Sequence, residues 1–194
     1  MRALPLREGW IYEVIVCTSL DGTPHAAPFG TWTDDRVGLE FLMYEGSRTL
    51  RNVLATRELV VAFPADVHTL FAALFAPGGL TFGRALTVGA PTLDGAQATV
   101  ELTVDGTRPV EDAVRVSAMP RRVAVEGDVT PLNRADGLLL ESLVLATRAE
   151  LPGAPAVLPV LDENLRVVRK VAPGSAAERD LEALVRRLRS ASSA

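Results

Sequence analysis

The segment YEGSRTLRNV, residues 44–53, combines small hydroxyl side chains with arginines and an asparagine directly after an apolar run. If a strand ends here and a helix begins near Thr49, the first backbone N–H groups of that helix have no intrahelical acceptor. Those groups, the hydroxyls of Ser47 and Thr49 and the charge of Arg48 together favour a phosphate ligand. Asn52, one helical turn further on, faces the same side and can bond either the ligand or the loop. The alternative is a capped helix start with solvated arginines.

A second segment, DGTPHAAPFGTW, offers a surface against which a flat ligand can lie. Ala26, Ala27 and Gly30 are small enough for close approach to the strand backbone, and Pro28 indicates that this edge is not continuously paired. Tight packing alone is the competing explanation for such a run of small residues. The chain has neither a G-x-x-x-x-G-K nor a G-x-G-x-x-G motif, so neither a P-loop nor a Rossmann nucleotide site is predicted.

Thiol and metal chemistry have little support in this sequence. Cys17 is the only cysteine and lies in an apolar, strand-like run, which predicts a structural thiol. The two histidines, His25 and His68, have no accompanying cluster of cysteines or carboxylates, so no metal site is expected. His68 is expected to be a plain surface or strand-end histidine, whereas for His25 a ligand role and a plain surface or strand-end role both stay open.

Charge and composition argue against several classes of partner. The net charge is −4, the pI is near 5.3 and aromatic residues make up 5% of the chain, so it lacks the basic groove and stacking platform that nucleic acids need. No apolar h-region follows MRALPLREGW, and the longest uncharged stretch, residues 67–83, is broken by Pro77, Gly78 and Gly79. We therefore expect a cytoplasmic protein without a membrane span, and a short buried helix at residues 67–76.

The elements that must position these segments are mostly strands. Three strand-like runs follow one another, at residues 10–18, 25–32 and 37–44. Asp21-Gly22 is a strong hairpin signal between the first two runs, and Asp94-Gly95 and Asp105-Gly106 are similar signals further on. These runs predict a strand meander that continues into the second half of the chain.

Helices are interspersed among the strands. Leu50, Val53 and Leu54 have the spacing of a short amphipathic helix that starts at Ser47 or Thr49. LVVAF, residues 59–63, predicts a strand that is buried on both faces. Seven or so strands with such helices indicate a closed or partly closed barrel.

The length of 194 residues suits one main core with a small appendage. We expect a barrel domain with a packed helix in residues 1–150. LPGAPAVLPV predicts a linker, and SAAERDLEALVRRLRS predicts a helix with Ser175 and Glu178 in capping-box spacing. We therefore expect residues 151–194 to be a linker and a C-terminal helix that docks on the barrel or on a partner subunit.

Glu141 interrupts the most apolar helical run, residues 138–146, and Arg134 and Arg148 lie seven residues to either side of it. A carboxylate buried in such a run needs a charged partner. The two arginines are expected either to pair with Glu141 in a structural or dimer contact, or to reach a cofactor or substrate.

The order of these segments resembles a known superfamily. EVIVCTSLDGTPHAAPFGTW, then GLEFLMYEGSRTLRNV, then LVVAF, is similar to the FMN-binding split-barrel superfamily. PLNRADGLLLESLVLATR narrows the resemblance to flavoproteins of the domain of unknown function 447 family, and the resemblance covers residues 10–148. The implied fold is mainly β with helices: a split β-barrel with a C-terminal helical extension.

The resemblance also implies a homodimer that binds FMN at or near the subunit interface. In this chain the phosphate would be surrounded by Ser47, Arg48, Thr49 and Asn52, and Tyr44 would border the ring. The ribityl chain and the ring would be lined by the strand residues His25, Ala26, Ala27, Pro28, Phe29 and Gly30. Relatives often carry asparagine where this chain has His25, so a side-chain bond to the flavin there departs from the family pattern.

An FMN-dependent oxidoreductase is the first functional expectation, because a redox cofactor explains why no other catalytic set is recognisable. The substrate and the redox partner are open: a nicotinamide, a deazaflavin and a reduced protein are all compatible donors. The resemblance implies an association with tetrahydromethanopterin-linked one-carbon metabolism, which adds a pterin partner to the options. The alternatives are a non-catalytic flavin-binding or flavin-sensing dimeric module, and a structural dimer that holds no flavin.

Overall fold

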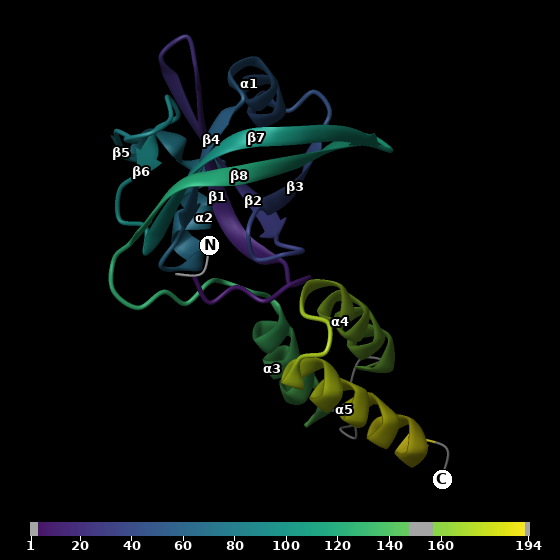
Figure 1. The fold of residues 1–194 in the computed structure, drawn as a ribbon. Helices are drawn as coiled ribbons and strands as arrows, with labels where there is room; N and C mark the ends of the chain where they lie inside the picture. The colour runs from purple at the N-terminus through teal and green to yellow at the C-terminus, as the bar shows by residue number, and fades with distance from the viewer. Residues whose placement is uncertain (1–3, 148–156, 193–194) are drawn as a thin grey trace. The chain divides into compact units, whose positions relative to one another are not determined.

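The computed structural model describes residues 4–147 and 157–192 (Figure 1). The chain divides into two compact units, one containing Tyr12–Leu132 and one containing the residues from Asn133 onward together with Gly9–Ile11. The elements of the first unit are β1 (Tyr12–Leu20), β2 (Thr23–Trp32), β3 (Leu39–Tyr44), α1 (Arg48–Thr56), β4 (Glu58–Phe63), α2 (Val67–Phe75), η1 (Pro77–Gly79), β5 (Phe82–Gly83), β6 (Thr92–Leu93), β7 (Ala98–Val110) and β8 (Ala113–Val125).

Six of these strands form a closed antiparallel barrel in the order β1-β2-β3-β8-β7-β4, while β5 and β6 pair as a separate small sheet. The predicted hairpin turn at Asp21-Gly22 is confirmed, because Leu20 pairs with Thr23 and both turn residues have positive φ, 51° and 73°. Such a two-residue turn matches the twist of the paired strands. The prediction of a mainly β barrel with helices is therefore confirmed.

The predicted turn at Asp105-Gly106 is wrong. Both residues lie inside β7, where the register to β8 shifts between Val104 and Gly106. The chain reverses further on, at Glu111-Asp112, where Glu111 has a φ of 53°. A glycine also accommodates a β-bulge, and the long pairing of β7 with β8 outweighs the local turn preference.

The core explains why β1 and β4 are so apolar. The central residues of β1 and the whole run from Leu59 to Phe63 in β4 are buried on both faces, which confirms the strand predicted at residues 59–63. On one face, Ile15 and Cys17 pack with Ala73 of α2 in an outer apolar cluster. Burial raises the pKa of the Cys17 thiol to about 12, so the thiol stays protonated and structural, as predicted.

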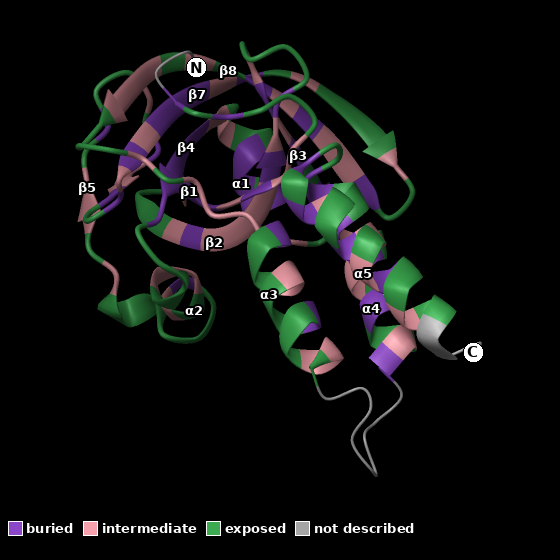
Figure 2. Cartoon of the chain, turned by 90° about the horizontal axis from the view of Figure 1, so that it is seen from below, coloured by how far each residue is buried: buried purple, intermediate pink, exposed green. Residues whose placement is uncertain are grey.

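Helix α2 is present where the sequence predicted it, and Asp66 caps it by accepting the N–H of Thr69 at 3.0 Å. The prediction that this helix is buried is wrong, because Ala73 is its only buried residue. Its other side is an exposed apolar stripe (Figure 2), formed by Val67, Phe71, Leu74 and Phe75. No helix within residues 4–147 or 157–192 is long and apolar enough to cross a bilayer.

A buried carboxylate ties the loop that precedes β6 to the barrel wall. Glu101 of β7 is only 1% exposed and accepts hydrogen bonds from the N–H of Leu86 and from both the N–H and the hydroxyl of Thr87. Arg122 lies 3.4 Å from its other oxygen. Desolvation raises the pKa of Glu101, but these donors outweigh it and lower the pKa overall. The carboxylate is therefore ionised at neutral pH.

The second unit is a three-helix cluster of α3 (Ala135–Ala146), α4 (Val157–Val171) and α5 (Ala176–Ser192). Its core is formed mainly by the apolar faces of these helices, with Leu161, Val168 and Leu181 fully buried. Asn133 joins its segments by donating to the carbonyls of Ile11 and Val171. The sequence predicted α5 and its Ser175 cap, which accepts the N–H of Glu178. The predicted linker is wrong at residues 157–160, which form the first turn of α4, and the rest of α4 was left undefined.

Glu141 of α3 is exposed, so the expectation that it is buried is wrong. Arg134, at the start of the same helix, is exposed as well, and Arg148 lies outside the described residues. The buried polar side chain of α3 is Ser142 instead, whose hydroxyl accepts from the amide of Asn164 at 3.0 Å and donates to the carbonyl of Leu138. The division between the units at Leu132 places α3 with the C-terminal helices.

Replacing Glu101 by glutamine should lower the free energy of unfolding by roughly 1.5 to 3 kcal/mol at neutral pH, because the charge-assisted bonds to Leu86 and Thr87 are lost. A carboxyl with a lowered pKa in the folded protein stabilises it above its unfolded pKa and ceases to do so as the pH falls through the folded value. The difference between wild type and Glu101→Gln should therefore shrink in acid. Urea unfolding at several pH values measures it, with the exposed Glu126→Gln as control; equal stabilities at neutral pH would contradict the anchoring role.

Candidate functional site

The start of α1 and the β1–β2 hairpin meet through a cluster of polar side chains. Thr18 of β1 pairs directly with His25 of β2. The imidazole Nε2 of His25 lies 3.0 Å from the Thr49 hydroxyl, and the tautomer decides which group donates. The Asn52 amide donates to the Thr18 hydroxyl at 3.0 Å. Thr18, Thr49 and Asn52 are buried, so these bonds hold the helix on the hairpin.

The local sequence shapes the helix start as predicted. Gly46 takes a φ of 76°, and Ser47 then caps α1 by accepting the N–H of Leu50 at 3.2 Å. The cap leaves the Ser47 hydroxyl hydrogen available as a donor. The backbone N–H groups of Arg48 and Thr49 have no intrahelical acceptor at this end of the helix. Donors therefore gather where the sequence predicted a phosphate.

Two arginines add positive charge to this end of α1. Arg48 and Arg51 are exposed, and neither has an ion pair with any residue in the part of the chain that the structure describes. Desolvation, followed by the charges of Arg48 and Arg51, lowers the pKa of His25. The imidazole is therefore neutral at neutral pH, and the two guanidinium groups are the cations of the site.

Arg51 was not among the residues predicted for the site. Its position carries a signal that would have identified it, because it lies three residues after Arg48 and four after Ser47, on one helical side. The residues that were predicted to surround the phosphate, Ser47, Arg48, Thr49 and Asn52, do come together at the helix start. Thr49 and Asn52 are buried and bonded within the chain, so their visible role is to position the helix.

The strand residues predicted to line the ring divide between two faces of β2. His25, Ala27 and Phe29 pair with Thr18, Val16 and Val14 and share their face. Ala26, Pro28 and Gly30 point to the opposite face, and Ala26 is buried in the outer apolar cluster. These six residues cannot all line one surface of the strand through their side chains. Their contact with a cofactor stays a prediction.

The edge of β2 that faces β3 is largely unpaired. In the described residues, β2 pairs with β3 only at Thr31 and Trp32. Between His25 and Gly30 the backbone groups on this edge have no strand partner, so they are available to a ligand. Tyr44 ends β3 with its side chain 60% exposed. Among the described residues, it bonds to the polar cluster through its carbonyl alone, which accepts the N–H of Ser47.

These groups match the chemistry of FMN, which offers a phosphate, a chain of hydroxyls and a flat ring. Arg48, Arg51 and the free N–H groups suit the phosphate. The Asn52 amide oxygen is buried and has no hydrogen-bond partner among the described residues, and a hydroxyl donor would satisfy it. The residues present therefore fit the cofactor. No group of three or more histidine, cysteine or acidic residues suited to a metal ion occurs in residues 4–147 and 157–190.

Solved structures with this fold include several flavoproteins. An FMN-bound protein from Methanosarcina mazei is 22% identical, with 96% of this chain and 98% of that chain covered and a TM-score of 0.58. A flavin reductase solved with NADP+ is 16% identical over 66% of this chain and 86% of its own, with a TM-score of 0.55. Component B of a nitrilotriacetate monooxygenase from Mycobacterium thermoresistibile is 18% identical over 63% and 74%, with a TM-score of 0.54. The barrel is therefore of the FMN-binding split-barrel type.

Family models describe both units of the chain. None of the curated proteins compared with the sequence matches it. Residues 12–127 match the N-terminal domain of the protein family of unknown function DUF447, and residues 133–187 match a second model of that family. The boundary between the two models coincides with the division between the barrel and the helical unit. This chain belongs to the DUF447 family.

Proposed function

We propose that the protein binds FMN through the start of α1 and the adjoining edge of β2, and that it acts as an oxidoreductase. The observation that carries the proposal is the position of Arg48 and Arg51, which have no ion pair within the described residues, beside free N–H groups at a helix start. The FMN-bound structure of a similar protein supports the choice of cofactor. The flavin reductase and monooxygenase component with this fold support the reaction class.

Each residue of the site has a distinct task in this proposal. Arg48 and Arg51 bind the phosphate charge, and the N–H groups of Arg48 and Thr49 donate to its oxygens. Asn52 holds α1 on the hairpin through Thr18. His25 fixes the Thr49 hydroxyl and accepts a proton when a second negative charge approaches. Bound FMN would supply the hydride or electron transfer.

The homodimer predicted from the family resemblance is part of the proposal. The exposed apolar stripe of α2 supports it, since side chains such as Phe71 and Phe75, whose rings lie 4.9 Å apart, are 63% and 68% exposed in the single chain. An apolar stripe of this kind on a short helix is typical of a protein interface. The cytoplasmic location and a link to tetrahydromethanopterin chemistry stay predictions.

The second candidate is a flavin-binding or flavin-sensing module without catalysis. The same cationic helix start would hold the cofactor in both cases, so binding does not separate them. A redox assay separates the two candidates: NADH or NADPH is added to reduce the bound flavin, and electron acceptors are then added to reoxidise it. Turnover with any such pair supports the oxidoreductase, whereas a flavin that no donor reduces supports the module.

The double variant Arg48→Ala/Arg51→Ala should bind FMN roughly 100-fold more weakly, because two charge-assisted contacts of about 1.5 kcal/mol or more each are removed. Quenching of flavin fluorescence during titration measures the dissociation constant. The exposed Arg187→Ala in α5 removes a similar charge elsewhere and should leave the affinity unchanged. A folded double variant with wild-type affinity would place the phosphate away from α1.

His25 should make FMN binding stronger as the pH falls. Its pKa is lowered in the free protein by desolvation, Arg48 and Arg51, and a bound phosphate dianion raises it again, so binding takes up a proton. The affinity should therefore rise as the pH falls through the pKa of the complex. His25→Asn removes this contribution while the pH dependence of the phosphate itself remains. Parallel profiles for the two proteins would exclude a role of His25 in phosphate binding.

A charge placed in the α2 stripe should prevent dimerisation. Phe71→Asp buries a carboxylate in the proposed apolar interface, which costs several kcal/mol without a partner. Light scattering coupled to size-exclusion chromatography should show a dimer for the wild type and a monomer for this variant. Val160→Asp, on the exposed side of α4, is the matched control and should stay dimeric. A dimer that survives Phe71→Asp would locate the interface elsewhere.

A further inference from the structure

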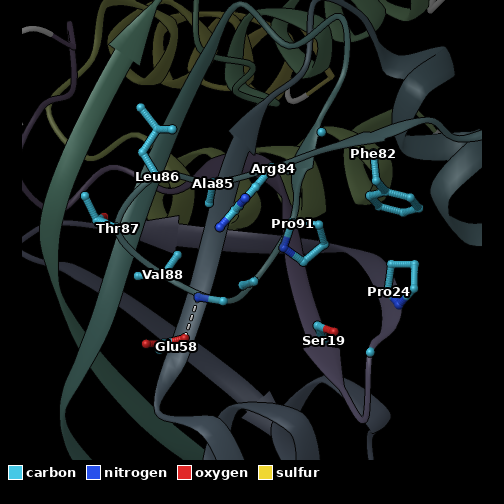
Figure 3. Close-up of a pocket in the computed structure, with 14 residues that line it drawn as sticks. Ser19, Pro24, Glu58, Phe82, Arg84, Ala85, Leu86, Thr87, Val88 and Pro91 are labelled. Atoms are coloured by element: carbon cyan, nitrogen blue, oxygen red, sulfur yellow. Dashed lines mark hydrogen bonds between the residues drawn. The ribbon is translucent and has the colours of Figure 1, made fainter.

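A cavity of about 600 Å³ lies between the tip of the β1–β2 hairpin and residues 82–91, which comprise β5 and the loop that follows it (Figure 3). Ser19 and Pro24 border it from the hairpin, while Phe82, Arg84 and Pro91 border it from the loop. We propose that this cavity is a second ligand site, which takes a small organic anion with an apolar body, and that Arg84 binds its anionic group. No sequence motif marks any of these residues as a site.

The loop that walls the cavity is held in place by two carboxylates from the barrel. Glu58, at the start of β4, accepts the N–H of Gly89 at 2.6 Å, the bond drawn in Figure 3. Glu101 of β7 holds the N–H groups of Leu86 and Thr87. With its backbone fixed at these points, the loop cannot close onto the hairpin, and a ligand would not have to order it on binding.

Among the residues that the structure describes, Arg84 is the one cation that borders this cavity. Its side chain extends over the middle of the cavity in Figure 3, and no residue in the described part of the chain forms an ion pair or a hydrogen bond with it. Glu58, the acidic residue at the cavity, already accepts the N–H of Gly89 through one carboxylate oxygen. An unpaired guanidinium above a preformed cavity favours a carboxylate or a phosphate monoester, which it can bind through two parallel hydrogen bonds.

The lining residues other than Arg84 indicate what the part of the ligand beyond its anionic group is like. Phe82, Pro24 and Pro91 provide apolar surface on one side of the cavity, and the Ser19 hydroxyl provides a polar contact at the hairpin (Figure 3). Pockets of this size that combine apolar surface with a few convergent polar groups are typical of small-molecule sites. The proposed ligand is therefore an anion with an aromatic or aliphatic body rather than an inorganic ion.

The cavity is separate from the phosphate-binding cluster. None of His25, Ser47, Arg48, Arg51 and Asn52 lines it, and neighbouring residues of β2 such as Pro24 and His25 point to opposite faces of the strand. The inference therefore does not rest on the proposed flavin site. A result that excludes the second anion site would not exclude the flavin site, and the reverse also holds.

Calorimetric titration of small anions into the whole chain tests the proposal. If the protein binds FMN, it is first saturated with FMN, so that the flavin site is not available to the probe. Benzoate and phenyl phosphate are the anionic probes, and benzyl alcohol is the neutral one. We expect at least one anion to bind at millimolar concentration and the alcohol to bind more weakly. Arg84→Gln should weaken the anion roughly tenfold or more, whereas Arg108→Gln, an exposed arginine that does not line the cavity, should leave binding unchanged.

A second variant, Ser19→Tyr, fills the cavity from the hairpin and should abolish binding without removing a charge. It keeps the test decisive if Arg84→Gln does not fold. Preference for benzoate or for phenyl phosphate distinguishes a carboxylate ligand from a phosphate ester. Three outcomes would each overturn a second anion site. Neither anion binds, neither variant weakens the binding, or added FMN displaces a probe that is bound to the FMN-free protein.

Discussion

The attachment of α1 to the end of the barrel by buried polar bonds is the interaction on which the candidate site depends. Asn52 and Thr49 face the hairpin, where Thr18 and His25 bond them. Buried polar groups must be paired, so sliding or rotating the helix would break both bonds at once. The helix start is thereby fixed beside the open edge of β2, and the positive end of its dipole faces outward together with its arginines.

A similar arrangement occurs on the other side of the hairpin, with carboxylates in place of the neutral side chains. There, strand carboxylates hold backbone N–H groups of a loop, Glu58 through Gly89 and Glu101 through Leu86 and Thr87. In both places side chains of the barrel fix a segment that is not part of it. Arg48 and Arg51 in the first place and Arg84 in the second have no acidic partner in the described residues, and an unpaired cation on a rigid support is what an anionic ligand requires.

The fold and the function rest on different kinds of support. Structures that share the barrel at identities of 16% to 22% establish its architecture, and the family models place both units within one family. A barrel of this kind can host several chemistries, so activity has to be argued from the site. In this chain the argument rests on the donors and charges around Ser47 and Arg48.

Much of the local structure follows from neighbouring residues alone. The Asp21-Gly22 turn, the Ser47 cap and the doubly buried strand at residues 59–63 were all predicted, because turn geometry, capping and hydrophobic runs are properties of a few consecutive residues. The candidate phosphate residues at the start of α1 belong to the same class. The position of Arg51 was equally accessible from its helical spacing.

Contacts between distant segments decided the rest. His25 and Thr49 are 24 positions apart, and Glu101 lies 14 positions from Thr87; no local pattern predicts that either pair will meet. Asp105-Gly106 became a bulge because β8 pairs along the whole of β7, and α2 kept its apolar stripe exposed because the barrel covers only one side of it. The sequence determined which elements form, since their preferences are local, whereas the partners of each side chain depend on how the closed sheet brings remote residues together.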